Sequence, residues 1–171
     1  MSKGLIRREN PALKKCGKSK NPGNGTETAK EDNMTTVEKA HELAKKAHAG
    51  QVDKAGKDYI THPEKVSTLV EGEDEKCVAL LHDVLEDTDV QEETIRSEFG
   101  DTIADAVVAM TRNKGESYED FIKRAKLNPI ARKVKIADLT HNMDLRRIPN
   151  VTEKDIQRVE KYKRALKVLQ D

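Results

Sequence analysis

The sequence has few of the features that would place it in several large classes of protein. It has no tryptophan, 3% aromatic residues and two cysteines among 171 residues. Two cysteines exclude a disulfide framework as the source of stability. The net charge is only +1, which argues against a nucleic-acid binder, because such proteins carry a basic stripe. No apolar run approaches the roughly 20 residues of a membrane-spanning helix, so we expect no membrane segment.

The first 33 residues differ in composition from the rest of the chain. They carry eight Lys or Arg and four Asp or Glu, a net charge of +4, with almost no apolar periodicity. Such a segment buries too little apolar surface to offset its ordering entropy, so residues 1–33 are predicted to be a disordered basic extension. They also lack the apolar stretch of about 7–15 residues of a signal peptide, which predicts a cytoplasmic protein. Residues 34–171, with a net charge of about −3, are predicted to form one domain.

Helical patterns fill residues 34–171, and no segment there reads convincingly as a strand. Ser or Thr followed three residues later by an acidic residue recurs at expected helix starts, as at Thr35 and Glu38. Apolar residues then follow at helical spacing. The expected helices cover residues 35–49, 63–70, 73–86, 94–99, 102–111, 117–125, 129–145 and 152–169. The fold class is therefore predicted to be all-α, a compact bundle of about eight helices.

The most informative polar residues lie in the most apolar expected helix, residues 73–86. His82 and Asp83 interrupt its hydrophobic sequence, and a buried charge is costly unless it has a partner. Glu86 follows His82 by four residues and Asp87 follows Asp83 by four, so helical spacing places all four side chains on one side of the helix. Three carboxylates this close repel one another unless a cation lies among them. Imidazole and carboxylate together suit a divalent transition metal.

Two other segments are candidates to complete this site. His62 precedes a proline and is expected at a helix start. In the next-to-last expected helix, Lys135, Asp138, His141 and Asn142 form one polar stripe. A stripe with an acid, an amide and a cation suits a metal with a phosphorylated ligand, and His141 could either line that site or serve in packing.

A His-Asp pair on a helix is by itself more often structural than functional. The combination of this pair with the acidic residues after it and with the two other segments is much less expected by chance. The remaining histidines, His41 and His48, lie on the first expected helix, and we expect structural roles for both. His48 is close enough to the turn at Gly50 to touch the site.

These motifs resemble a known family. The chain is similar to the HD superfamily of metal-dependent phosphohydrolases, and more narrowly to the hydrolase domain of RelA/SpoT-type alarmone enzymes and the small alarmone hydrolases. The matching segments are AHAGQVDKAGKDYITHP, ALLHDVLEDT, FGDTIADAVVAMTR and VKIADLTHNMDL, beginning at residues 47, 79, 99 and 134. The resemblance implies that residues 34–171 form an HD-type bundle.

The resemblance also implies roles for individual residues. It implies a metal, usually Mn²⁺, held by His62, His82, Asp83 and Asp138. It implies that Glu86 and Asp87 organise or activate the attacking water. Lys54 and Asn142 match positions that contact the nucleotide, and Tyr59 matches a family aromatic. Lys135 is expected, with Lys54, to offset phosphate charge.

Three positions depart from the family pattern. Asp53, Leu139 and Asp144 stand where the family has arginines, one of which helps to hold the guanine base. Since residues 34–171 are also mildly acidic, substrate capture must rely on the metal and a few local cations. The departures leave the expected metal site complete and place the substrate specificity in question.

The resulting prediction is a metal-dependent phosphohydrolase acting on a small nucleotide. The first expectation is a guanosine-3′,5′-bis(diphosphate) 3′-pyrophosphohydrolase that releases pyrophosphate. One alternative is an HD-type nucleotide or NADPH phosphatase without guanine selectivity, which Asp53 favours. The other is a catalytically inactive nucleotide-binding module, against which the retained Glu86 and Asp87 argue. The sequence suggests no nucleic-acid, membrane or protein partner and does not determine the oligomeric state.

Overall fold

The computed structural model describes residues 6–7 and 34–171, and in this part the chain is almost entirely helical. The prediction of an all-α bundle of about eight helices is confirmed. The elements are β1 (Ile6–Arg7), α2 (Thr36–Ala47), β2 (Gln51–Val52), α3 (Thr61–Ser67), α4 (Glu73–Leu81), α5 (Val84–Asp87), α6 (Glu92–Met110), α7 (Tyr118–Leu127), α8 (Pro129–Asn142), the 3₁₀ turn η1 (Leu145–Arg147) and α9 (Glu153–Gln170). No helix of the described part is long and apolar enough to cross a bilayer.

Side-chain caps fix the starts of several helices where the sequence predicts them. The Thr35 hydroxyl accepts a hydrogen bond from the Glu38 amide, and the Glu38 carboxylate accepts one from the Thr35 amide. Ser117 Oγ accepts from the Asp120 amide at the start of α7. Asn128 Oδ1 accepts from two amides of the first turn of α8, both at 3.0 Å. These caps satisfy amide groups that have no partner inside their own helix.

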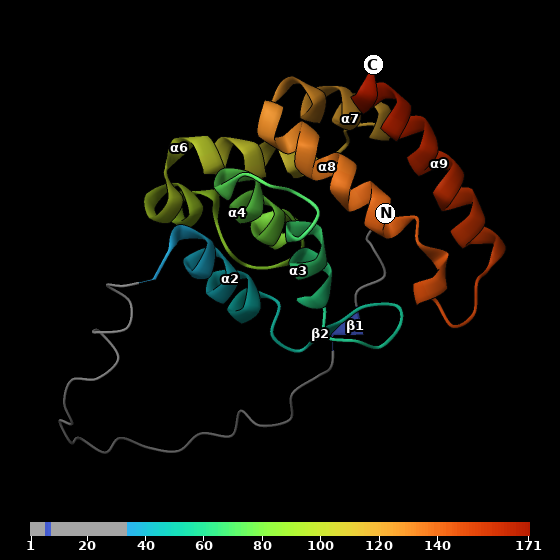
Figure 1. Cartoon of the computed structure of the whole chain (residues 1–171), viewed down its shortest axis with the longest axis horizontal. Helices are drawn as coiled ribbons and strands as arrows, with labels where there is room; N and C mark the ends of the chain where they lie inside the picture. Colours follow the sequence, from blue (N-terminus) through green and yellow to red (C-terminus); the bar gives the residue numbers. More distant parts are fainter. Residues whose placement is uncertain (1–5, 8–33) are drawn as a thin grey trace, which may run out of the picture.

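Helix α4 lies at the centre of the bundle, in contact with α2, α3, α6 and α8 (Figure 1). These elements form the larger of two hydrophobic clusters. The second cluster lies between α7, α8 and α9 and includes Phe121, Leu139 and Tyr162. Helix α8 contributes to both clusters, through Ala131 and Val134 to the first and through Leu139 to the second. The polar stripe of α8 is therefore held between two packed layers.

The continuous helix expected over residues 73–86 is wrong, because the chain breaks at the His-Asp pair. Helix α4 ends at Leu81, with His82 as its C-cap, and α5 begins at Val84 after Asp83. Consecutive residues of one α-helix point about 100° apart, so an unbroken helix would separate the two side chains. The break allows His82 Nε2 and Asp83 Oδ2 to lie 3.1 Å apart.

Two smaller differences concern α3 and the last helix. Helix α3 begins at Thr61, two residues before the expected Pro63 start, and a proline is tolerated there because it lies in the first turn. In the first turn of α9 the apolar Ile156 is 46% exposed, although apolar residues at helical spacing are expected to face the core. The neighbouring Asp155 is buried instead, because its carboxylate is bound by side chains of the chain itself.

The predicted disordered extension, residues 1–33, lies outside the described residues except for Ile6–Arg7. These two residues form β1, which pairs antiparallel with β2 and places Ile6 opposite Val52. The ribbon is two residues long on each side and does not change the fold class. Gly100 interrupts α6 with a φ of +81°, which separates the two helical segments expected there.

Candidate metal centre

Four side chains from three parts of the chain converge on one buried point. His62 comes from α3, His82 and Asp83 from the α4–α5 break, and Asp138 from α8. His62 Nε2 lies 3.1 Å from Asp138 Oδ1 and 3.7 Å from Asp83 Oδ2. His82 Nε2 lies 3.1 Å from Asp83 Oδ2 and 3.7 Å from Asp138 Oδ1. All four residues are at most 4% exposed.

The two imidazoles are oriented by hydrogen bonds at their other nitrogen. His82 Nδ1 lies 2.7 Å from the carbonyl oxygen of Ala79, so this nitrogen is the donor. His62 Nδ1 lies 2.8 Å from Nδ1 of His141, whose ring stacks on His62 at a centroid distance of 5.0 Å. Nε2 of each imidazole faces the carboxylates of this cluster, and among the described residues it has no other polar partner. A bound Nδ1 that leaves Nε2 available is the arrangement of a metal-binding histidine.

The electrostatics of the site favour a cation. Burial lowers the pKa of His82, but the carboxylates of Asp83 and Asp138 outweigh it and raise the pKa to about 9. Burial lowers the pKa of His62, although Asp138 acts in the opposite direction. The two carboxylates therefore attract about one positive charge to this point. A proton on His82 can supply it, and a divalent ion supplies it more fully.

Both carboxylates are held by donors from other residues. Tyr59 donates its hydroxyl proton to Asp83 Oδ2. Lys135 Nζ lies 2.9 Å from Asp138 Oδ2, and Asn142 Nδ2 donates to Asp138 Oδ1 at 2.5 Å. Lys135 is itself only 5% exposed, and it lies over the ring of Phe121, 4.9 Å from the centroid. These contacts orient the ligands before any ion binds.

The donor set fits a divalent metal ion. Ligand bonds of about 2.1 Å place neighbouring ligand atoms roughly 3.0–3.4 Å apart, close to the separations of 3.1 and 3.7 Å seen here. One ligand atom each from His62, His82 and Asp83 lies within 4.8 Å of the others. Two imidazoles with two carboxylates suit the divalent transition metals.

Three further residues support the site: the sequence left the roles of His141 and His48 open and did not single out Gln51. His141 stacks on His62 and contacts it through Nδ1, so it lies beside the site. His48 is buried, binds Gln51 through Nδ1 at 2.8 Å and packs on the Tyr59 ring. Gln51 Nε2 in turn donates to the backbone carbonyl of Asp87 at 2.9 Å. The signal available in the sequence was the position of His48 beside Gly50.

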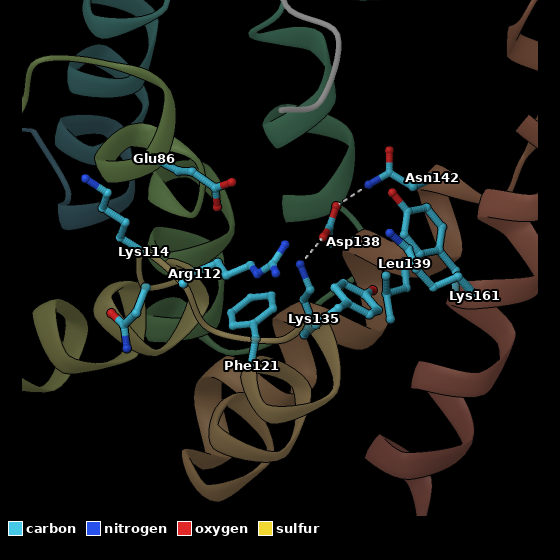
Figure 2. Close-up of a pocket in the computed structure, with 13 residues that line it drawn as sticks. Glu86, Arg112, Lys114, Phe121, Lys135, Asp138, Leu139, Asn142 and Lys161 are labelled. Carbon is cyan, nitrogen blue, oxygen red and sulfur yellow. Dashed lines mark hydrogen bonds and ion pairs between the residues drawn. The ribbon is translucent and has the colours of Figure 1, made fainter. Parts of the chain in front are cut away.

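A cavity of about 330 Å³ is lined by Asp138 of this cluster and reaches to α9. Glu86, Arg112 and Lys114 lie on one side of it, and Asp138, Asn142 and Lys161 on the other (Figure 2). Its wall also contains the aromatic rings of Tyr118, Phe121 and Tyr162, together with Lys135, the buried cation of α8. The cavity thus combines cations with flat apolar surfaces, beside a site that fits a metal.

Three further cations of the cavity were not named as candidate site residues from the sequence. Arg112 and Lys114 follow α6, and Lys161 lies on α9. Burial lowers the pKa of Lys161, and the neighbouring positive charges of Arg112, Arg158 and Lys135 lower it further. Several like charges gathered in one place favour binding of an anion.

The expected catalytic and substrate-binding residues divide into two groups. Glu86, Lys135 and Asn142 line the cavity, whereas Asp87 is not in its wall and accepts a hydrogen bond from Gln51 at its backbone carbonyl. Tyr59 is buried against Asp83 instead of lining the cavity. Lys54 also lies outside the cavity wall, because its Nζ is paired with Asp155 Oδ1 at 3.1 Å. The roles of all these residues in binding and catalysis stay predictions.

The three residues that replace family arginines are each used by the fold. Asp53 Oδ1 accepts hydrogen bonds from the amides of Ala55 and Lys57, at 2.8 and 2.9 Å, and so closes its own loop. Leu139 is 1% exposed in the second hydrophobic cluster. Asp144 pairs with Arg146 at 2.8 Å.

Comparison with known proteins agrees with this architecture. The family model described as "HD domain" matches residues 40–167. A probable GTP pyrophosphokinase of Mycobacterium leprae is 35% identical over 124 residues, 65% of this chain and 16% of the relative. A guanosine-3′,5′-bis(diphosphate) 3′-pyrophosphohydrolase of Haemophilus influenzae is 34% identical over 116 residues, 59% of this chain and 17% of the relative.

Two further matches have the name SpoT. The bifunctional (p)ppGpp synthase/hydrolase SpoT of Escherichia coli is 30% identical over 128 residues, 66% of this chain and 18% of the relative. A solved structure titled "A metazoan ortholog of SpoT hydrolyzes ppGpp and plays a role in starvation responses" superimposes with a TM-score of 0.67 at 24% identity. It covers 80% of this chain and 85% of the other, and it supports the fold. The chain spans less than a fifth of the length of the three curated relatives. Because the family model matches three quarters of its length, the chain belongs to the HD domain family.

Proposed function

We propose that this protein is a metal-dependent phosphohydrolase of nucleotides, with guanosine-3′,5′-bis(diphosphate) as its substrate and pyrophosphate released from the 3′ position. The observation that carries the proposal is the cluster of His62, His82, Asp83 and Asp138 beside a cavity lined by cations. Hydrolysis of a polyanionic phosphoester requires a metal ion and, beside it, positively charged side chains that offset the phosphate charge. The names of the Haemophilus and Escherichia relatives support this choice of substrate.

The metal is proposed to be Mn²⁺, held by His62, His82, Asp83 and Asp138. Mn²⁺ accepts both imidazole nitrogen and carboxylate oxygen. When bound, such an ion lowers the pKa of a coordinated water and polarises a phosphoryl oxygen. Tyr59, Lys135 and Asn142 hold the two carboxylates in the orientation that binding needs.

Glu86 and Asp87 are proposed to handle the attacking water. The Glu86 side chain is exposed in the cavity wall, one turn after His82, and its carboxylate can accept a proton there. Asp87 is partly buried, and its backbone carbonyl is fixed by Gln51, which limits the movement of this turn. Glu86 is the general base in this proposal, and Asp87 orients the water.

The phosphates of the substrate are proposed to lie against Arg112, Lys114 and Lys161. All three line the cavity opposite or beside the metal ligands. Their charge offsets the charge of the anion, which the mildly acidic domain as a whole does not attract. The rings of Tyr118 and Tyr162 offer flat apolar surfaces for the nucleoside.

A second candidate function is a nucleotide phosphatase without guanine selectivity. The favouring observation is the loop after β2, where Asp53 binds its own backbone in place of a family arginine that helps to hold the base. This function uses the same metal site and differs in how the base is selected.

The test is a substrate panel with the purified full chain and Mn²⁺. Guanosine-3′,5′-bis(diphosphate) should yield guanosine 5′-diphosphate and pyrophosphate, with Asp83→Ala inactive and Asp89→Ala, an exposed residue near the same turn, fully active. Equal rates on adenosine analogues and on 5′-monophosphates would favour the second candidate. Turnover of none of these compounds would contradict both, and full activity of Asp83→Ala would contradict the site.

A further inference from the structure

A buried carboxylate at the start of α9 connects this helix with the loop between β2 and α3. Asp155 is 3% exposed, and its Oδ2 accepts hydrogen bonds from the amide and hydroxyl of Thr152 at 3.0 and 2.6 Å. Its Oδ1 binds Lys54 Nζ at 3.1 Å and Arg158 at 2.7 Å. A helix cap needs only the first pair of contacts, as Glu38 shows at the start of α2.

The two cations bound by Asp155 come from two segments, each of which also carries a residue of the proposed site. Lys54 lies in the loop between β2 and α3, which five residues later supplies Tyr59 to the ligand Asp83. Arg158 lies on α9, three and four residues before Lys161 and Tyr162 of the cavity wall. Helical spacing places all three on one face of α9. Arg158 is close enough to lower the pKa of Lys161 by charge repulsion.

We propose that Asp155 is a specificity-determining residue that withholds Lys54 and Arg158 from the substrate. The inference rests on the proposed nucleotide site. The single negative charge of Asp155 offsets half of the positive charge of Lys54 and Arg158, so half remains for an incoming anion. The two ion pairs also fix the positions of both side chains. The terminal phosphoryl group of a nucleoside 5′-diphosphate must compete with Asp155 for these cations. A nucleotide with one phosphate fewer has less to gain from them.

The charge distribution of α9 distinguishes this role from capping alone. The first turn buries Asp155 while the apolar Ile156 beside it is 46% exposed. The helix thus turns a charged residue inward, toward the loop of Lys54, at the cost of apolar burial. Thr152 keeps Asp155 in this orientation through two hydrogen bonds, so the carboxylate is held for its cations before any substrate arrives.

The experiment is a double-mutant cycle read by binding. Titration calorimetry measures guanosine 5′-diphosphate and 5′-monophosphate on the Mn²⁺-loaded full chain, as wild type, Asp155→Asn, Lys54→Met and the double variant. Asparagine keeps an oxygen for the cap while removing the charge. Glu38→Gln is the matched control, because it removes the same charge from the capping box of α2.

We expect Asp155→Asn to bind the diphosphate about fivefold more tightly, the range of a partly exposed ion pair, with a smaller change for the monophosphate. Lys54→Met should change binding by less than about twofold in the wild type and should abolish the gain in the Asp155→Asn background. Glu38→Gln should leave both affinities unchanged. This pattern would support Asp155 as a selectivity residue and not only a cap.

Several results would overturn the inference. These are unchanged or weaker diphosphate binding by Asp155→Asn, no binding by any variant, or a large loss with Lys54→Met alone. If Asp155→Asn does not fold, as judged by thermal unfolding, the Lys54→Met result by itself decides. Binding needs no turnover, so a failure of the proposed hydrolysis is seen separately, in the substrate panel.

Discussion

The metal centre and the cationic cavity beside it are built in opposite ways. The four proposed ligand side chains are nearly inaccessible, and each is oriented by a contact to another residue. The cations on the far wall, Arg112 and Lys114, are partly or fully exposed and lie in the connection after α6. The difference teaches that the proposed chemistry depends on buried, pre-oriented groups, while the proposed selectivity depends on side chains that can move.

The two regions also differ in how the fold supports them. Asp138 lies on α8 between the two hydrophobic clusters, so its position is fixed by packing on both sides. The exposed cavity cations come instead from the connection after α6, and Lys161 from helix α9. Substitutions in the metal centre should therefore affect all substrates alike, and substitutions in the cavity should affect them unequally.

The largest effect is expected for Asp138→Asn in the metal centre. The change removes a ligand charge and leaves the buried Lys135 without its anionic partner. Mn²⁺ affinity should fall by more than about 100-fold, since even outer contacts to metal ligands are worth about 10–100-fold. Metal content and turnover should fall together. Asp105→Asn, at an exposed position of α6, is the control, and metal binding retained by Asp138→Asn would remove Asp138 from the site.

A second prediction concerns the proton on His82. Its pKa of about 9 in the metal-free protein means that the imidazole is protonated at pH 7, whereas a metal needs it neutral. Mn²⁺ binding at pH 7 should release about one proton, and affinity should rise about tenfold per pH unit up to pH 9. Calorimetry in buffers of different ionisation enthalpy measures the release. A binding constant that does not change between pH 7 and 9 would contradict the charge balance described.

The cavity side of the comparison is tested by Lys161→Met. Removing this charge should raise KM for the phosphorylated substrate about tenfold, the value of one hydrogen bond to a charged group. Mn²⁺ affinity should not change, because in the described part of the chain no hydrogen bond or ion pair joins Lys161 to a proposed ligand residue. Lys163→Met, two residues along the same helix and outside the cavity, is the control. Equal losses in metal affinity and in KM would end the distinction between the two regions.

The smallest effect is expected at the support of α8. Asn128→Ala removes the acceptor for two first-turn amides and should cost about 1 kcal/mol of stability. For a chain of this size that corresponds to a decrease in Tm of about 2–4 °C. Differential scanning calorimetry measures it, with kcat at 25 °C expected to be unchanged. A large fall in kcat would show that packing fixes Asp138 less firmly than its burial indicates.

The sequence by itself determined the helical class, most helix starts and the members of the proposed metal centre. Caps such as Thr35 and Asn128 act within one turn, so local chemistry suffices to place them. His82 and Asp83 were recognisable because a charge in an apolar helix needs a partner. The stripe of Lys135, Asp138 and Asn142 was recognisable because residues three and four positions apart lie on one face of a helix.

Only the tertiary structure decided which residues from other parts of the chain contact these side chains. The break after Leu81 departs from the helical spacing expected there. The stacking of His141 on His62 and the pair of Lys54 with Asp155 join residues far apart in the chain. The Lys54 pair spans 101 positions of the chain. No local propensity encodes such a contact, because its energy exists only after the two hydrophobic clusters have brought the helices together.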